Sequence, residues 1–336
     1  MRFLEVDGLG QVSRVGLGTW QFGSREWGYG EDYATGPARD IVRRARELGV
    51  TLFDTAEVYG FGRSEKILGE ALGGERSSVV VASKIFPVAP FPAVVRNRFE
   101  GSARRLQLER IPLYQVHQAN PVVPDSITMT GMGELLREER IGAVGVSNYS
   151  LERWQAADAA LGRPVVSNQV QFSLASAGPL TDLVPFAERE GRVVIAYSPL
   201  AQGLLGGRYS ATHRPGGVRA MNPLFGTENL RRAEPLLALL REVAAAHDAT
   251  PAQVALAWLL GLPRVVVIPG ASTVAQLESN VAAADLALTD AQQTDLTAAA
   301  REFRPQSSAR TLVDEVRSRF DGARSRFDGA RSRFGV

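Results

Sequence analysis

The chain has 336 residues, of which 45% are hydrophobic and 22% are charged, a composition typical of a globular protein. It contains no cysteine, which excludes disulfides, zinc thiolate sites and cysteine nucleophiles. The formal net charge is +2. Six arginines against two aspartates give residues 317–336 a net charge of +4, so residues 1–316 carry a net charge of −2. A mildly acidic main body does not support a nucleic-acid-binding role.

The beginning of the chain predicts a small β-hairpin rather than a targeting segment. MRFLEVDGLGQVSR, residues 1–14, has no apolar run of signal-peptide length, and its hairpin could close one end of the main domain. No segment of the chain has about 18 uninterrupted apolar residues. We therefore expect a cytoplasmic protein that does not act on membranes.

Eight short apolar runs follow, each with the length and composition of a buried strand. Amphipathic stretches typical of helices, such as residues 38–49 and 150–162, separate them. This alternation predicts an α/β fold with a parallel sheet covered by helices, and eight units predict a closed (β/α)8 TIM barrel. An open doubly wound sheet is the alternative, but no G-x-G-x-x-G turn follows the first run. The predicted strands span residues 15–20, 50–55, 78–84, 112–118, 143–148, 165–172, 192–198 and 264–270.

Three connections that follow predicted strands are long, at residues 21–37, 119–133 and 199–233. In a barrel, the loops after the strands gather at one face, and we expect the active site there. The segment AREFRPQ ends the predicted barrel domain, which spans residues 1–306.

Residues 307–336 are predicted to form a separate basic tail. The segment RSRFDGA occurs twice and RSRFGV follows, so Phe320, Phe327 and Phe334 recur every seven residues. That period fits a helical stripe, but the glycines between the phenylalanines weaken a helix. We expect a disordered, duplicated appendage, with a docking helix or an oligomer contact as the alternative.

Polar residues interrupt the predicted strands at the ends that should face the active site. Asp54, Lys84 and His117 end the second, third and fourth strands, and Tyr59 follows Asp54 in a turn-rich segment. The chain has only two lysines, so a lysine at the end of a hydrophobic strand indicates a need for a compact ammonium. Taken singly, these residues could be a turn cap, half of an ion pair, a core histidine and a packed ring. Because a barrel brings strand ends together, we predict that the four form one site.

Together these four side chains are suited to the reduction of a carbonyl. A phenol ionises near pH 10 and a nearby ammonium lowers that value, so Tyr59 could donate a proton to a carbonyl oxygen. Asp54 would balance the buried charge of Lys84, and His117 could hydrogen-bond and orient the same carbonyl. Such a site needs a hydride donor. The sequence shows no cluster of metal ligands, and we predict no metal.

At this point the sequence resembles the aldo-keto reductase family. The segments GLGTW, FDTAEVYG, GVSNYS, NQVQFSL, AYSPLAQGLLGG and IPGAS match the family in the expected order, and the resemblance runs from about residue 3 to 304. The branch that it resembles has long post-strand loops and is related to the potassium-channel β-subunits. In this family, the residues that match Asp54, Tyr59, Lys84 and His117 form the catalytic tetrad, with the tyrosine as the acid.

The resemblance implies that NADPH lies extended across the mouth of the barrel. Ser147, Asn148 and Gln169 would hold the nicotinamide carboxamide, and Tyr197 would stack on the ring. Backbone amides of residues 198–204 would wrap the pyrophosphate, and residues 270–280 would meet the adenosine half at a helix N-terminus. The cofactor-binding residues predicted in this way are Thr19, Trp20, Asp54, Ser147, Asn148, Gln169, Tyr197, Ser198, Pro199, Leu200, Gln202, Gly203, Leu204, Arg208, Arg219, Gly270, Ser272, Gln276 and Asn280.

The last loop departs from many members of the family. These members place Lys or Arg there to grip the 2′-phosphate of NADPH, whereas this chain has Gly270 and Gln276. The channel β-subunit branch also has glutamine there and holds NADPH, and Arg219 could supply a charge. The resemblance therefore implies NADPH, with NADH not excluded.

The predicted substrate pocket is rich in aromatic residues, which favours apolar or aromatic carbonyls. We expect a small-molecule carbonyl substrate, no nucleic-acid or membrane partner, and a monomer or weak homo-oligomer. The residues predicted to line the pocket are Trp20, Gln21, Trp27, Tyr59, Phe86, Gln118 and Tyr149.

Reduction of aldehydes or activated ketones by NADPH is the function that these observations favour. One alternative is a redox-sensing binding module that holds NADPH and turns over slowly. Another is a Schiff-base aldolase that uses Lys84 as its nucleophile and needs no cofactor.

Overall fold

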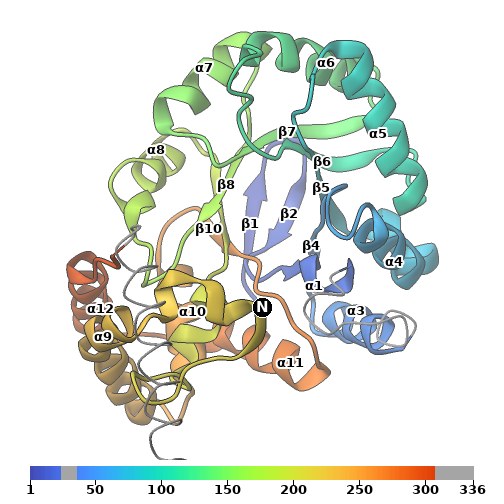
Figure 1. Ribbon diagram of the computed structural model, residues 1–336. Coiled ribbons are helices and arrows are strands. Elements are labelled where there is room, and N and C mark those ends of the chain that lie inside the picture. The colour runs from blue at the N-terminus through green and yellow to red at the C-terminus, as the bar shows by residue number, and fades with distance from the viewer. Residues whose placement is uncertain (24–35, 307–336) are drawn as a thin grey trace, which may run out of the picture.

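The computed structural model describes residues 1–23 and 36–306. Eight parallel strands pair in chain order, and parallel bridges from Val15 to Val267 and from Gly18 to Gly270 join the first strand to the last. Helices surround the strands in Figure 1, so the predicted (β/α)8 barrel is confirmed. The strands are β3 (Leu17–Gly18), β4 (Leu52–Asp54), β5 (Val80–Ile85), β6 (Ile111–Val116), β7 (Ile141–Ser147), β8 (Ser167–Gln171), β9 (Val193–Tyr197) and β10 (Val265–Val267).

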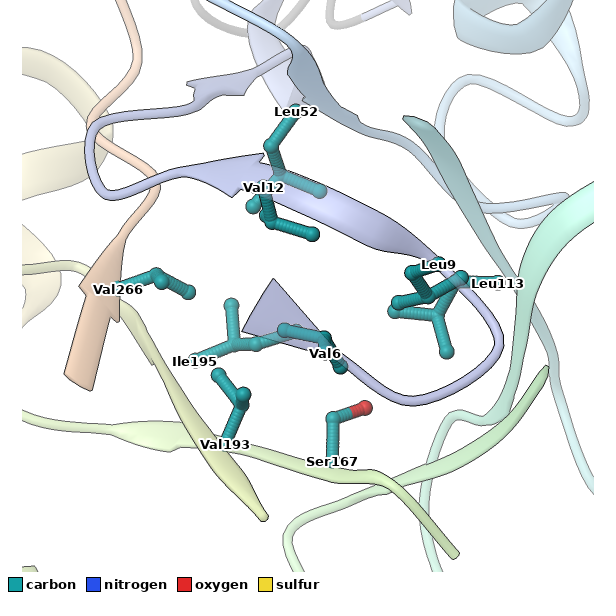
Figure 2. Close-up of a pocket in the computed structure, with 9 residues that line it drawn as sticks. All are labelled: Val6, Leu9, Val12, Leu52, Leu113, Ser167, Val193, Ile195 and Val266. Carbon is teal, nitrogen blue, oxygen red and sulfur yellow. The ribbon is translucent and has the colours of Figure 1, made fainter. Parts of the chain in front are cut away.

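The predicted hairpin closes the amino-terminal end of the barrel. Its strands, β1 (Phe3–Val6) and β2 (Gly10–Ser13), pair antiparallel in the middle of the ring of strands (Figure 1). Val6 and Val12 pack with apolar side chains of the barrel interior (Figure 2), and the cavity left there has a volume of only about 10 Å3. A substrate must therefore enter from the opposite end.

The helices cover the barrel with apolar faces that their sequence spacing predicts. In α3, the buried residues Ala38, Ile41, Val42 and Ala45 recur at intervals of three and four, which places them on one face. The described α-helices are α1 (Trp20–Gly23), α3 (Pro37–Glu47), α4 (Arg63–Leu72), α5 (Pro92–Leu106), α6 (Asp125–Arg137), α7 (Leu151–Leu161), α8 (Leu183–Arg189), α9 (Thr227–Ala246), α10 (Pro251–Gly261), α11 (Val274–Ala282) and α12 (Asp290–Glu302). Short 3-10 helices are η2 (Gly73–Ser78), η3 (Gly178–Leu180), η4 (Ala201–Gly206), η5 (Gly217–Met221), η6 (Pro223–Phe225) and η7 (Ala283–Asp285).

Two of the three predicted long loops are shorter than expected. Residues 125–133 belong to α6, and residues 227–233 belong to α9. The two glycines in the first segment make it look like a loop, but Gly131 allows a close helix contact, since an added Cβ would lie 2.9 Å from the Cβ of Val95 in α5. In the remaining connection, residues 21–37, residues 21–23 belong to α1 and Pro37 begins α3, whereas residues 24–35 lie outside the described residues. The predicted tail at 307–336 also lies outside them.

The packed chain reaches the end of the predicted barrel domain. After α12, the backbone N–H of Gln306 donates to the side chain of Asn229 in α9 at 2.8 Å. Among the described helices, none combines the length and the apolar character that a membrane span requires.

Candidate active site

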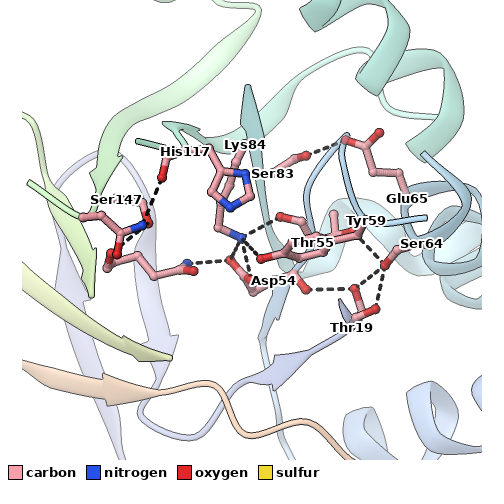
Figure 3. A network of polar contacts seen from close by, with 12 residues as sticks. Thr19, Asp54, Thr55, Tyr59, Ser64, Glu65, Ser83, Lys84, His117 and Ser147 are labelled. Atoms are coloured by element: carbon pink, nitrogen blue, oxygen red, sulfur yellow. Dashed lines mark hydrogen bonds and ion pairs between the residues drawn. The ribbon is translucent and has the colours of Figure 1, made fainter. Parts of the chain in front are cut away.

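The four predicted catalytic residues come together at the carboxyl ends of three neighbouring strands (Figure 3). Asp54 is the last residue of β4, Lys84 is the penultimate residue of β5, and His117 directly follows β6. Tyr59 lies in the turn between β4 and α4. Convergence of the strand ends therefore produces the constellation that the sequence predicts.

Lys84 and Asp54 form a buried ion pair. The Nζ of Lys84 lies 2.7 and 2.8 Å from the two carboxylate oxygens of Asp54, and it also donates to the carbonyl oxygen of Thr55 at 2.8 Å. The two residues are 0% and 2% exposed. Burial acts to lower the pKa of Lys84, but the carboxylate of Asp54 and the phenol of Tyr59 outweigh it, so the pKa is raised and the amine stays an ammonium. An ammonium has no lone pair with which to attack a carbonyl, and this geometry argues against a Schiff-base aldolase.

The hydroxyl of Tyr59 is the fourth neighbour of the ammonium, 3.3 Å from the Nζ of Lys84. Burial raises the pKa of Tyr59 more than the positive charge of Lys84 lowers it, and Asp54 adds to the increase. The expectation that the ammonium lowers this pKa overall is therefore wrong for the net shift, because it left out the loss of solvation. The phenol is protonated near neutral pH, which is the form that a proton donor needs.

His117 is a neutral imidazole beside Tyr59. Burial, with a smaller contribution from the ammonium of Lys84, lowers its pKa to about 3. Its ring lies edge-on to the ring of Tyr59, with centroids 5.7 Å apart, and to that of Phe86 at 5.9 Å. A neutral imidazole can donate one hydrogen bond to a substrate oxygen without competing with Tyr59 as a charged acid.

We expect the ring of His117 to remain unprotonated from neutral pH down to about pH 4. The unfolded chain takes up this proton near pH 6.5, so the stability that the group contributes is present above that pH and is lost as the pH falls toward 3. The measurement is the NMR shift of its ring proton against pH, assigned by its absence in a His117→Asn variant. Titration near pH 6.5 would contradict the buried, neutral ring.

The residues predicted to hold the nicotinamide adjoin this tetrad. The Nε2 of Gln169 donates to a carboxylate oxygen of Asp54 at 2.7 Å, which joins the two groups directly. Ser147 donates to the backbone carbonyl of Gln169 at 2.8 Å, and the hydroxyl of Tyr197 donates to the Oδ1 of Asn148 at 2.9 Å. These amides and this aromatic ring fit a flat heterocycle that bears a carboxamide.

The turn after β9 presents backbone amides in an unusual conformation. Ser198, Gln202 and Gly203 have φ values of 48°, 56° and 96°, and glycine is the residue that adopts the last of these without strain. The N–H groups of Ala201 and Gly203 donate to carbonyl oxygens within the turn, so the predicted pyrophosphate contact would fall to the other amides of the segment. Among the other predicted residues here, Arg208 is exposed and the side chain of Leu204 is buried, so Leu204 can contribute only its backbone.

A second side of the mouth is formed by the loops after β3 and β10. The Nε2 of Gln21 donates to the carbonyl oxygen of Ala271 at 2.8 Å, and Asn280 donates to the carbonyl oxygen of Gly270 at 3.4 Å. Gln276 accepts from the backbone N–H of Ser272 at 2.8 Å, at the start of α11. Of the remaining predicted cofactor residues, Thr19 is fully buried and its hydroxyl donates to the carbonyl oxygen of Asp54 at 2.9 Å, while Trp20 begins α1. Pro199 and Leu200 lie in the turn after β9, and Arg219 lies in η5.

The predicted substrate pocket is only partly assembled from the expected residues. Trp20 is 45% exposed and its ring lies 6.5 Å from that of Tyr59. The ring of His117 contacts both Tyr59 and Phe86, so Trp20, Phe86 and His117 form an aromatic wall beside the phenol. Gln118 is exposed, and Trp27 lies outside the described residues. The position of Tyr149 does not support a place in the wall, because its side chain is buried in the core and its hydroxyl donates to Asp125 at 2.7 Å.

Two carboxylates beside the tetrad, the fully buried Glu65 and the largely buried Glu57, were missed by the sequence analysis. Glu57 and Glu65 lie on either side of Tyr59 in the chain, and both form ion pairs with arginines of α5. The available signal was a glutamate inside the segment FDTAEVYG, where turn formers and apolar residues surround it. Within the described residues, no three His, Asp or Glu side chains lie close enough to hold a metal.

Comparison with known proteins assigns the chain to a family over nearly its whole length. Residues 14–301 match the model of the Aldo/keto reductase family. An oxidoreductase of Mycobacterium tuberculosis is 72% identical over 95% of this chain and 99% of its own length. The methylglyoxal reductase of Escherichia coli is 32% identical over 87% of this chain and 92% of its own. The crystal structure of an aldo-keto reductase from Klebsiella pneumoniae in complex with NADPH superimposes with a TM-score of 0.72 at 29% identity, covering 91% of this chain and 96% of that one.

Proposed function

This chain belongs to the aldo/keto reductase family and is an NADP-dependent oxidoreductase, and we propose that it reduces aldehydes and activated ketones to alcohols with Tyr59 as the general acid. A relative named as a methylglyoxal reductase and a neighbour bound to NADPH support carbonyl reduction with a nicotinamide cofactor. The observation that carries the proposal is the hydroxyl of Tyr59 within 3.3 Å of a buried ammonium.

NADPH, when bound, supplies the hydride that the carbonyl carbon accepts. The residues that would hold it are those that adjoin the tetrad: Gln169, Asn148 and Ser147 for the carboxamide, and Tyr197 for the face of the ring. The amides of the turn after β9 and the start of α11 would hold its phosphates.

The residues of this chain would then perform the proton transfer. As the carbonyl oxygen gains negative charge, the Oη of Tyr59 gives it a proton, and the ammonium of Lys84 stabilises the phenolate that remains. Asp54 holds that ammonium in place, and the neutral ring of His117 donates a hydrogen bond to the same oxygen. One hydride and one proton together convert the carbonyl to an alcohol.

The aromatic wall of Trp20, Phe86 and His117 favours flat, apolar carbonyl substrates. We expect aromatic aldehydes to be reduced with a higher kcat/KM than small polar ones. The assay mixes the protein with NADPH and a panel of aldehydes and follows the loss of NADPH absorbance. Turnover confined to small polar aldehydes would contradict this substrate class.

NADPH should be the better hydride donor, although the last loop lacks the lysine or arginine that other members use. Gln276 is already engaged with the backbone of Ser272 and carries no charge. The same assay with NADH measures the preference.

Single-turnover hydride transfer much faster than steady-state turnover would instead favour a slow, NADPH-holding redox sensor.

A further inference from the structure

We propose that Glu57 and Arg98 act as a positioning pair that holds the catalytic tyrosine against the lysine-bearing strand. The inference rests on the proposed role of Tyr59 as the acid. Neither residue touches the tetrad through its side chain, so the pair acts through the segment that carries Tyr59 and through the strand end that carries Phe86.

Glu57 extends the pairing of β4 with β5 beyond the end of β4. The backbone N–H of Thr55 donates to Ala82 at 2.9 Å, and that of Glu57 donates to the carbonyl oxygen of Lys84 at 3.3 Å. The carboxylate of Glu57 then accepts from the backbone N–H of Phe86 at 2.5 Å. Glu57 therefore binds the backbone of the catalytic lysine and that of Phe86, the residue that directly follows β5.

Arg98 of α5 binds both the carboxylate of Glu57 and the backbone of Phe86. Its Nε and Nη2 lie 2.9 and 2.6 Å from the two carboxylate oxygens of Glu57, and its Nη1 donates to the carbonyl oxygen of Phe86 at 2.7 Å. The planar guanidinium thus binds the carboxylate through two nitrogens and the strand end through a third. The pair is largely buried, with side chains that are 9% and 25% exposed.

Few residues separate this pair from the reacting groups. Tyr59 follows Glu57 by two residues, and its N–H donates to the carbonyl oxygen of Ala56 at 3.1 Å, so the turn that carries the phenol contains the anchored residue. Phe86 contacts His117 ring to ring. A shift of Glu57 would change both the separation of Tyr59 from Lys84 and the wall against which a substrate packs.

The second buried carboxylate makes a similar contact but lies farther along the chain. Glu65, inside α4, accepts from Ser83 and pairs with Arg105, which lies one heptad after Arg98 on α5. This contact joins α4 to β5 at a point beyond the turn that carries Tyr59. Glu57, unlike Glu65, lies in the chain between the end of β4 and Tyr59.

The test compares Glu57→Gln with the parent and with Glu100→Gln as a control. One oxygen of Glu57 accepts from the N–H of Phe86 and from Nη2 of Arg98, and the other accepts from Nε of Arg98. Glutamine replaces one of these oxygens with an NH2 group, which cannot accept, so at least one of the contacts is lost. We expect single-turnover hydride transfer to slow about 10- to 100-fold, because misplacement of a catalytic group by about an ångström has effects of this size. The dissociation constant of NADPH should change by less than about two-fold, because the pair contacts none of the predicted cofactor residues. Glu100 pairs with Arg140 near the surface, away from the mouth, and its variant should keep the parental rate.

A crystal structure of Glu57→Gln without cofactor gives a readout that does not depend on activity. The hydroxyl of Tyr59 should lie farther from the Nζ of Lys84 than in the parent, or the ring of Phe86 should be displaced. Parental geometry together with a rate within about two-fold of the parent would overturn the inference, even if the variant melts at a lower temperature.

If Glu57→Gln does not fold, Glu57→Asp is tested in its place. This variant keeps the charge and shortens the side chain by one methylene. The same two readouts apply, and a parental rate with parental geometry again overturns the inference. If the parent reduces no carbonyl, or if Tyr59→Phe is as active as the parent, the proposed function fails instead. The crystal structure still tests whether Glu57 positions Tyr59.

Discussion

Replacement of Tyr59 by phenylalanine is expected to reduce carbonyl reduction by about 10²- to 10⁴-fold, the usual contribution of a positioned acid. The variant keeps the ring that packs against Trp20 and His117 and removes only the hydroxyl that faces Lys84. Without that hydroxyl, no proton is delivered to the carbonyl oxygen as it gains negative charge. The measurement is the single-turnover rate of hydride transfer from NADPH, together with the dissociation constant of NADPH, which should change little.

A matched control is Tyr114→Phe. Tyr114 is fully buried in β6, and its ring packs against Phe99 of α5, so it lies on the outer side of the barrel wall. Removal of its hydroxyl should leave the rate of hydride transfer unchanged. Parental turnover by Tyr59→Phe would show that another group donates the proton.

The second large effect is expected for Lys84→Met. This change leaves the carboxylate of Asp54 buried without its cation, and loss of one partner of a buried pair typically costs about 3–5 kcal/mol of unfolding free energy. It also removes the charge that stabilises the phenolate of Tyr59, so hydride transfer should slow as well. Urea denaturation measures the first effect and single-turnover kinetics the second.

The chain offers an unusually clean control, because its only other lysine is Lys66. The side chain of Lys66 is 68% exposed and lies 3.9 Å from Glu70, so Lys66→Met should change the unfolding free energy by less than about 1 kcal/mol. A double variant, Lys84→Met with Asp54→Asn, should regain part of the lost stability because the unpaired charge is gone. Equal stability of the two single lysine variants would contradict the ion pair at the centre of the site.

The sequence alone could place the tetrad because the argument needed only the order of strands. Asp54, Lys84 and His117 each lie at or next to the end of an apolar run, and any closed parallel barrel brings those ends to one face. The eight runs were identifiable because a strand covered on both sides is apolar throughout. Local composition and topology were sufficient for these conclusions.

Properties that depend on three-dimensional surroundings were beyond the sequence. The net shift in the pKa of Tyr59 depends on how fully the ring is buried, which its neighbours in the chain do not reveal. The pairing of Glu57 with Arg98 joins residues 41 positions apart through a helix packing that no local pattern specifies. The aromatic character of Tyr149 indicated a pocket wall, whereas its hydroxyl contacts Asp125.

A crystal structure with NADP and an unreactive carbonyl compound tests the central claim most directly. The carbonyl oxygen should lie about 3 Å from the Oη of Tyr59 and within hydrogen-bonding reach of a ring nitrogen of His117, with the nicotinamide against its carbon. A carbonyl oxygen held by other groups, with the hydroxyl of Tyr59 pointing away from both the ligand and Lys84, would contradict the role of Tyr59 as the acid.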